Sequence, residues 1–192
     1  MKFHTHDINK KTFIIAEIGN NHEGDFDLAK KMISLAAEAG ADAVKFQTID
    51  AESFIASHLK DRKNKLKTFQ FSRKQFRELA EFSHKNNVLF FSTPFDIESA
   101  IFLNEIQPIF KISSGDNNFF PLIDIITSFN KPIIISTGLS DKNGIDKLYN
   151  RILNNKKGKN YNLDLSFLHC VSSYPVPFKE ANISVIANLI ES

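Results

Sequence analysis

Two short apolar runs that flank one amphipathic segment constrain the fold of this chain more than any other feature. The runs read FIIAEI from residue 13 and ADAVKFQT from residue 41. Asp25 and Gly40 stand where a helix N-cap and the residue after a C-cap are expected. A strand-helix-strand crossover of this kind requires two parallel strands. The residues predicted to form the buried face of the helix recur at helical spacing: Leu28, Met32, Leu35, Ala36 and Ala39.

The same unit repeats along the chain. Further apolar runs predict strands at residues 88–92, 109–113, 133–136 and 165–169. Helices are expected at residues 72–83, 96–104, 117–129, 140–153 and 182–190. The first of these opens with the capping-box pattern Ser72-Arg73-Lys74-Gln75, and Ser140 or Asp141 caps the fourth. Near-continuous apolar strands, each followed by a helix, are typical of a parallel sheet covered on both faces.

Two architectures use such a series, the open doubly wound sheet and the (β/α)8 barrel. The open sheet would usually carry a GxGxxG turn after its first strand, and the sequence IGNNHEG lacks that spacing. We therefore predict an α/β fold of the TIM-type (β/α)8 barrel, incomplete here with about six β/α units. Residues 1–192 are expected to form a single partial-barrel domain.

Three polar stretches are expected outside the strands and helices of this series. Residues 1–12 are predicted to form a loop or a short hairpin. The charged stretch within residues 50–71 is interpreted as a solvated loop, or alternatively as a mobile lid that brings positive charge to an anionic substrate. Residues 154–162, reading NNKKGKNYN, are predicted to form a surface loop.

Composition narrows the class of protein. Charged residues make up 24% of the 192 residues and the net charge is +2, which gives no support for nucleic acid binding. The sequence has no apolar run long enough to cross a membrane and no secretory signal, so we expect a cytoplasmic location. Cys170 is the single cysteine, which excludes an internal disulfide. We interpret it as a small buried residue.

Polar side chains gather where the predicted strands end. Two lysines and several hydroxyls at one edge suit a small, multiply anionic ligand such as a phosphorylated carboxylate. Alternatively, the lysines reach the rim and pair with Glu17 and Asp116. The residues are Glu17, Lys45, Gln47, Ser92, Thr93, Lys111, Ser113, Ser114, Ser136, Thr137, His169, Ser172, Ser173 and Tyr174.

These strand ends lie in sequence blocks that resemble those of the sialic acid synthase family, whose members condense phosphoenolpyruvate with an N-acetylated hexose. Six blocks appear in the family's order and spread over nearly the whole chain. They are IAEIGNNHEG from residue 15, ADAVKFQT from residue 41, FSTPF from residue 91, KISSGD from residue 111, KPIIISTG from residue 131, and LHC from residue 168 through Tyr174-Pro175.

The resemblance implies a role for each matching residue. Lys45 and Lys111, with hydroxyls of Thr93, Ser114 and Ser136, would hold the carboxylate and phosphate of phosphoenolpyruvate, and Ser172 would contact the same ligand. Glu17, Gln47 and Tyr174 would meet the N-acetylated hexosamine. Asp116 stands where many members carry Glu and would take part in proton transfer, so the catalytic set is Glu17, Lys45, Lys111 and Asp116.

The family also implies a divalent metal, Mn²⁺ or Mg²⁺, whose histidine ligands come from the seventh and eighth strand regions. We expect no metal ligands within residues 1–192 and no antifreeze-like C-terminal domain in them. Family members are expected to be homodimers. We expect the 192-residue chain alone to lack synthase activity and to behave poorly as a monomer, because a partial barrel leaves strand edges unpaired.

Other interpretations remain open on the residues alone. A related synthase could form a 3-deoxy-ulosonate phosphate, and an inactive barrel fragment could retain anion binding or serve an assembly. His22 and His169 lie near strand ends, where each is either a metal ligand or, more commonly, a hydrogen-bonding residue in a packed loop.

Overall fold

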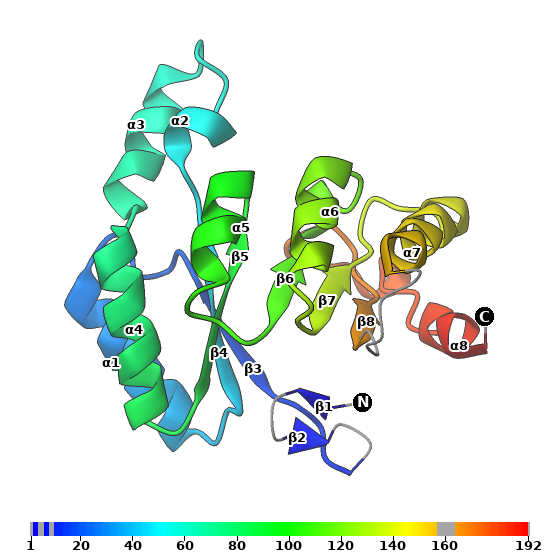
Figure 1. The fold of residues 1–192 in the computed structure, drawn as a ribbon, viewed down its shortest axis with the longest axis horizontal. Helices are drawn as coiled ribbons and strands as arrows, with labels where there is room; N and C mark the ends of the chain where they lie inside the picture. Colours follow the sequence, from blue (N-terminus) through cyan, green and yellow to red (C-terminus); the bar gives the residue numbers. More distant parts are fainter. Residues whose placement is uncertain (1, 4–5, 8–9, 157–163, 192) are drawn as a thin grey trace. The chain divides into compact units, whose positions relative to one another are not determined.

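The computed structural model describes residues 2–3, 6–7, 10–156 and 164–191. The chain forms two compact units, Met1–Phe110 and Lys111–Ser192. Each unit is built on a sheet of three strands, in the order β3-β4-β5 and β6-β7-β8 (Figure 1). The strands are followed by helices, so the α/β class predicted from the sequence is confirmed. Among the described residues, no helix is both long enough and apolar enough to cross a membrane.

The sheet of the first unit consists of β3 (Ile15–Gly19), β4 (Ala43–Thr48) and β5 (Leu89–Pro94). All three strands run parallel, with Glu17 opposite Lys45 and Gln47 opposite Thr93. The predicted crossover and its parallel strands are therefore confirmed. A short antiparallel hairpin, β1 (Lys2–Phe3) and β2 (His6–Asp7), precedes the sheet, and the expectation of a loop or hairpin is met there.

Helix α1 (Phe26–Glu38) connects β3 to β4. Its predicted ends are confirmed, because Asp25 Oδ1 accepts a hydrogen bond from the Leu28 N–H at 2.9 Å and Gly40 has φ +83°. Its predicted buried face is partly wrong. Ala29 and Ile33 are fully buried, whereas Leu35 is 53% exposed. The two apolar stripes are neighbours on the helix, and periodicity alone does not say which one the sheet covers.

Helix α4 (Arg73–Lys85) begins with the predicted capping box between Ser72 and Gln75. Its buried side includes Phe76, Leu79 and Ser83, as the spacing predicts. Helix α5 (Ile97–Leu103) is capped by Asp96, whose Oδ1 accepts from the Ser99 N–H at 2.7 Å. In both helices a local side-chain bond fixes the first turn, which explains why the sequence predicts them well.

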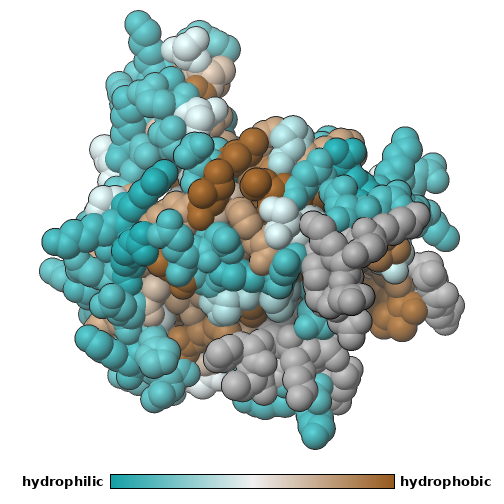
Figure 2. Space-filling model, viewed as in Figure 1, coloured by the Kyte–Doolittle hydropathy of each residue, from teal (hydrophilic) through white to brown (hydrophobic). Residues whose placement is uncertain are grey.

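The charged stretch after β4 is not a loop. It forms α2 (Ala51–Phe54) and α3 (Lys60–Phe69), and none of the α3 residues is fully buried. This region is hydrophilic at the upper left of Figure 2. Glu52 pairs with Lys63 and Lys67, which lie one helical turn apart. The helix therefore depends on an ion pair from a neighbouring segment, which the local pattern does not reveal.

The second unit holds β6 (Phe110–Ile112), β7 (Ile133–Ser136) and β8 (Leu165–Leu168), and β7 and β8 are parallel. A 3-10 turn, η1 (Ser114–Asp116), follows β6. The connecting helices are α6 (Phe120–Ser128) and α7 (Lys142–Lys156). A second 3-10 turn, η2 (Phe178–Glu180), and α8 (Val185–Glu191) follow β8. All three strands lie where the sequence predicts them.

The helices of the second unit differ from the prediction at their ends. Helix α6 starts at Phe120 instead of Asn117, because residues 117–119 belong to the non-helical connection that follows η1. Asp141 is the residue that bonds the first turn of α7, since its Oδ1 accepts from the Gly144 N–H at 2.8 Å. Residues 154–156, predicted as loop, are helical. The rest of that predicted loop, residues 157–162, lies outside the described residues.

Candidate active site

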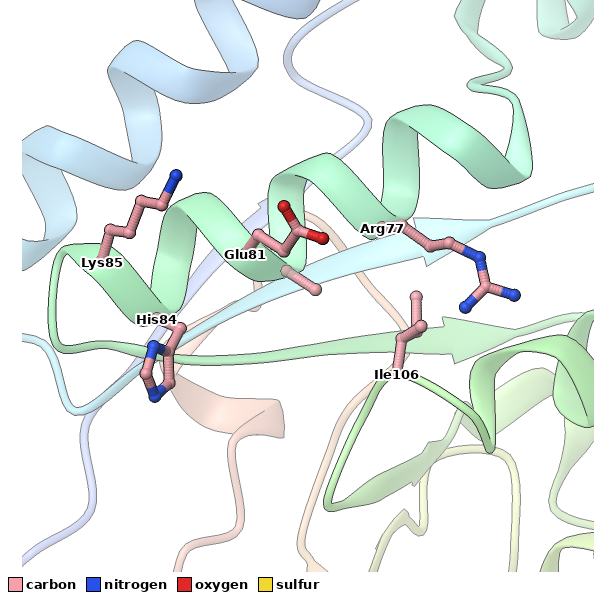
Figure 3. Close-up of a pocket in the computed structure, with 6 residues that line it drawn as sticks. Arg77, Glu81, His84, Lys85 and Ile106 are labelled. Atoms are coloured by element: carbon pink, nitrogen blue, oxygen red, sulfur yellow. The ribbon is translucent and has the colours of Figure 1, made fainter.

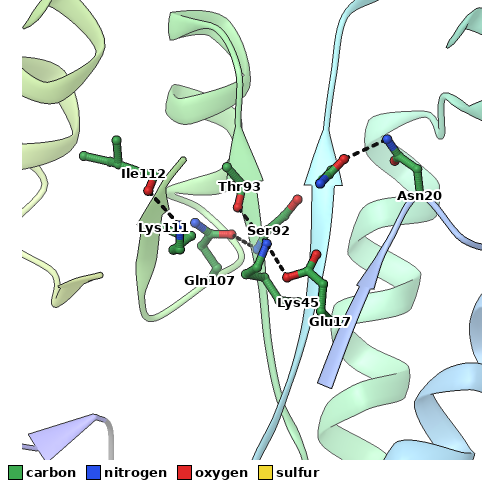
Figure 4. A network of polar contacts seen from close by, with 9 residues as sticks. Glu17, Asn20, Lys45, Ser92, Thr93, Gln107, Lys111 and Ile112 are labelled. Atoms are coloured by element: carbon green, nitrogen blue, oxygen red, sulfur yellow. Dashed lines mark hydrogen bonds and ion pairs between the residues drawn. The ribbon is translucent and has the colours of Figure 1, made fainter. Parts of the chain in front are cut away.

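Lys45 is the centre of the polar cluster in the first unit. It sits on β4 and is only 9% exposed, and its Nζ lies 2.7 Å from Glu17 Oε2 on β3. The same Nζ donates a hydrogen bond to Thr93 Oγ1 on β5 at 3.1 Å (Figure 4). Adjacent parallel strands thus bring together three of the predicted site residues. The register places Glu17 opposite Lys45, and Thr93 lies two residues beyond Phe91, the partner of Lys45 on β5.

The contacts of Lys45 bear on both interpretations of this lysine. The ion pair with Glu17 exists, as the alternative interpretation predicts, but the lysine is buried. A buried ammonium is costly unless it is paired and hydrogen-bonded. Glu17 and Thr93 take two of its three donors among the described residues, which leaves one N–H for an anionic ligand.

Gln47 forms a second polar contact in the first unit. Its Oε1 accepts a hydrogen bond from Asn20 Nδ2 at 2.9 Å. Asn20 belongs to the loop after β3, and the sequence analysis gave it no role. Asn20 lies in the block IGNNHEG, and its place in that block is the sequence feature that could have indicated a role in the site. The contact fixes the amide of Gln47 beside the strand ends, where the resemblance assigns it to the sugar.

His22 is a hydrogen-bonding residue of a packed loop. It is almost fully buried, its Nδ1 accepts the Gly24 N–H at 3.0 Å, and its ring stacks on Phe71 at 4.2 Å between centroids. Burial lowers its pKa below the ordinary value of 6.5. His169 in the second unit similarly bonds the Ala181 carbonyl through Nε2 at 2.8 Å. For both histidines, the hydrogen-bonding interpretation is the one that the contacts support.

In the second unit, Lys111 and Asp116 lie on β6 and the turn that follows it. Lys111 is 8% exposed and its Nζ donates to the Ile112 carbonyl at 2.7 Å (Figure 4). Asp116 Oδ2 accepts a hydrogen bond from Ser113 Oγ at 2.5 Å. Burial raises the pKa of Asp116, while the Ser113 hydrogen bond and the charge of Lys111 oppose that rise. A carboxyl in this setting is suited to proton transfer.

Two predicted hydroxyl residues of the second unit lie close to Gly138. A Cβ at this glycine would lie 2.7 Å from Ser114 Oγ and 2.7 Å from Ser172 Oγ. Asn117 Nδ2 donates to the Ser136 carbonyl at 3.3 Å and to the Gly138 carbonyl at 3.0 Å. Asn117 thereby ties the region after β6 to the end of β7. Sequence reasoning gave this asparagine no role, because nothing in the local pattern distinguishes it.

Not every predicted site residue of the second unit lies beside Gly138 and its neighbouring serines. Tyr174 is 98% exposed, so its side chain lies in solvent and not against the serines. Cys170 is a free thiol of intermediate exposure, and the expectation that it is buried is wrong. Both follow β8, where the chain has left the sheet and burial no longer follows from the strand pattern.

No group of three His, Cys, Asp or Glu side chains that could hold a metal ion occurs in residues 10–156 and 164–191 or the other described positions. The described residues thus include no such group for the divalent metal that the resemblance implies, whose histidine ligands are expected from the seventh and eighth strand regions.

A separate hollow of about 500 Å³ lies beside α4 and Ile106 (Figure 3). Its lining residues are Arg77, Ala80, Glu81, His84, Lys85 and Ile106. None of them comes from a strand end, and Arg77 is paired with Glu105. The hollow is therefore distinct from the candidate site.

The sequence that carries these strand ends matches a known family. The sequence pattern of the NeuB family matches residues 32–192. This chain belongs to the NeuB family. The family recognised from the six sequence blocks is thus confirmed.

Several curated members of the NeuB family resemble the chain closely. It is 41% identical to the N,N'-diacetyllegionaminic acid synthase of Campylobacter jejuni, covering 94% of this chain and 57% of that protein. It is 34% identical to the human N-acetylneuraminate-9-phosphate synthase, covering 91% and 51%. The chain spans about half the length of the curated relatives it matches.

A solved structure agrees with these matches. The N-acetylneuraminic acid synthetase of Leptospira borgpetersenii, in complex with citrate, superposes with a TM-score of 0.86 at 38% identity. The match covers 92% of this chain and 60% of that one. The relatives named above are nonulosonic acid synthases. The Leptospira structure shares its fold with the 92% of this chain that the superposition covers.

Proposed function

We propose that this protein takes part in the condensation of phosphoenolpyruvate with an N-acetylated hexose of the N-acetylmannosamine type. The product is a nonulosonic acid and the leaving group is phosphate. The observation that carries the proposal is the buried Lys45, held by Glu17 and Thr93 at the strand ends of a NeuB-family chain. A desolvated ammonium with a donor to spare is suited to bind a small anion. The citrate complex of the Leptospira relative agrees with an anion-binding family.

The site residues divide into the roles that the family resemblance assigns. Lys45, Thr93, Lys111, Ser114, Ser136 and Ser172 bind phosphoenolpyruvate. Glu17, Gln47 and Tyr174 meet the sugar, and Tyr174 must leave solvent to do so, since it is 98% exposed. Asp116 moves a proton. We further propose that the two three-stranded sheets are parts of a (β/α)8 barrel, whose strand ends are the usual place for catalytic residues.

The chemistry requires charge stabilisation and one proton acceptor. The enol carbon of phosphoenolpyruvate attacks the sugar aldehyde, so that a carbon–carbon bond forms, the carbonyl π bond breaks and the aldehyde oxygen takes up a proton. Water then adds to the cationic carbon that bears the phosphate oxygen, losing a proton. The hydroxyl so formed becomes the ketone as the carbon–oxygen bond to phosphate breaks, and its proton leaves with the phosphate. The lysines balance the carboxylate and phosphate charges, and Asp116, whose carboxyl binds a proton more readily than an ordinary aspartate, accepts the proton from water.

Calorimetric titration with phosphoenolpyruvate tests the anion site. Lys45→Met and Lys111→Met should each weaken binding by about 2 to 4 kcal/mol, because each removes a charge-assisted contact in a partly dry site. Lys142→Met, a lysine at the start of α7, is the control and should leave the affinity unchanged. Unchanged affinity in both site variants would remove the anion-site proposal.

Asp116→Asn, made at the matching position of a full-length NeuB-family protein, tests the proton-transfer role in an assay of phosphate release from phosphoenolpyruvate with N-acetylmannosamine. Turnover should fall about 100-fold or more while phosphoenolpyruvate binding changes little, because proton transfer matters only along the reaction path. Asp116→Glu, which keeps the carboxylate, should retain much of the turnover. An Asp116→Asn loss that lies wholly in binding would contradict the role.

A further inference from the structure

Ser113 uses its side chain in an unusual way for its position. It is the N-cap residue of the turn η1, where a serine commonly accepts a hydrogen bond from a backbone N–H. Here the side chain makes no such capping bond. Its hydroxyl donates instead to Asp116 Oδ2 at 2.5 Å. The Ser113 hydroxyl therefore bonds the Asp116 carboxylate and not the backbone of the turn.

We propose that Ser113 is a positioning residue for Asp116, holding Oδ2 of the carboxylate so that Oδ1 remains for proton transfer. The hydrogen bond is charge-assisted when the carboxylate is ionised, and such bonds are the stronger ones. What Asp116 does in the reaction rests on the function proposed above. The contact between the two side chains does not, since it belongs to the folded second unit alone.

The backbone of the turn is fixed without the Ser113 hydroxyl. The Asp116 N–H donates to the Ser113 carbonyl at 3.2 Å, and the Phe119 N–H donates to the Asp116 carbonyl at 2.9 Å. Asn117, the residue after Asp116, donates from its Nδ2 to the Gly138 carbonyl at 3.0 Å. Removing the hydroxyl by Ser113→Ala therefore leaves the bonds that shape the turn in place. The substitution changes the surroundings of one carboxylate and little else.

The surroundings of Asp116 fix the direction of the expected change. Burial raises the pKa of this carboxyl, and the two influences that lower it are the Ser113 hydrogen bond and, more weakly, the positive charge of Lys111 on β6. Without the hydroxyl, the ionised form loses its nearest donor while burial remains. The titration of Asp116 must then move to higher pH.

Carboxyl-carbon NMR of the full 192-residue chain measures this titration directly. The Asp116 signal is assigned by its loss in Asp116→Asn. Its midpoint should lie at higher pH in Ser113→Ala than in the wild type, and Ser113→Thr, which keeps a hydroxyl, should bring it back. Ser128→Ala is the matched control, because the Ser128 hydroxyl donates to the Ile125 carbonyl within α6 and not to Asp116. An unmoved midpoint in Ser113→Ala, or no return in Ser113→Thr, overturns the proposal.

A binding measurement separates this proposal from the proposed function. Calorimetric titration of the wild type with phosphoenolpyruvate tests the proposed function alone. If the wild type binds no phosphoenolpyruvate, the proposed function fails. The titration, which needs no substrate, still decides whether Ser113 holds Asp116.

Discussion

At the scale of single residues, Gly138 leaves room for the hydroxyls of Ser114 and Ser172 because it has no side chain. A methyl group here would lie 2.7 Å from both Ser114 Oγ and Ser172 Oγ, and 3.1 Å from Ser114 Cβ. The hydroxyls would have to rotate away, and the expected cost in folding free energy is about 1 to 2 kcal/mol. Gly138→Ala should therefore leave the chain folded but weaken phosphoenolpyruvate binding about tenfold or more by calorimetry.

Gly115→Ala is the matched control for this substitution. A Cβ at Gly115 would meet only Ser113 Oγ at 3.8 Å, which is ordinary contact. Equal losses of affinity in the two variants would show that the close approach at Gly138 does not matter for binding.

His22 gives the first unit a dependence on pH. Burial lowers its pKa below 6.5, so the unfolded chain takes up a proton at a higher pH than the folded chain does. The stability that His22 contributes is full above about pH 6.5 and is lost as the pH falls through that value toward the lowered folded pKa. The free energy of unfolding should therefore fall between about pH 7.5 and about pH 5.5 more steeply in the wild type than in His22→Gln.

Urea unfolding followed through the amide signals of α1 provides the measurement. His84→Gln, which changes an exposed histidine in the last turn of α4, should keep the wild-type slope. A His22→Gln slope that matches the wild type would mean that this histidine does not titrate differently on folding.

At the scale of elements, α3 is held by a close backbone approach that only glycine allows. Gly24 has φ +88°, and a Cβ there would lie 2.0 Å from the Thr68 carbonyl oxygen of α3. Gly24→Ala should therefore cost about 3 kcal/mol or more and should release α3. Hydrogen exchange of the α3 amides should become much faster, because few buried contacts hold this helix.

Gly40→Ala separates backbone strain from the clash. Gly40 has φ +83° but nothing lies within 4 Å of its Cβ position. This variant should cost about 1 kcal/mol, from the positive φ alone, and should leave α3 protected. Similar α3 exchange in the two variants would contradict the anchoring of α3 by Gly24.

The elements also show which features a sequence can reveal. The helices capped by Asp25, Ser72 and Asp96 were predicted because each cap lies within three residues of its partner. Helix α3 was missed because Glu52 and Gly24 stabilise it from outside its own sequence. The exposed position of Leu35 was missed because two apolar stripes on α1 compete, and only the tertiary packing decides between them.

At the scale of the whole molecule, the site residues were predictable to the extent that strand register determines them. The register of β3, β4 and β5 brings Glu17, Lys45 and Thr93 into contact, and the sequence blocks place all three at strand ends. The contacts of Asn20 and Asn117 were not predictable, because loops and turns have no period that fixes where a side chain points. The same reason explains the exposure of Tyr174.

The segment after β8 exposes large apolar side chains in an unusual concentration. Phe178 is 101% exposed, and Ile183 and Ile190 are 73% and 80% exposed. Side chains of this kind, gathered within one short segment, favour association.

We expect the purified 192-residue chain to self-associate in a concentration-dependent way, seen as a rising mean mass in sedimentation or light scattering. The triple variant Phe178→Ser, Ile183→Ser and Ile190→Ser should lower that mass toward the monomer, because it removes the apolar area without touching a strand. Ile101→Ser, at a singly exposed isoleucine of α5, is the control and should associate as the wild type does. A wild-type chain that stays monomeric at every concentration would show that this surface does not drive association.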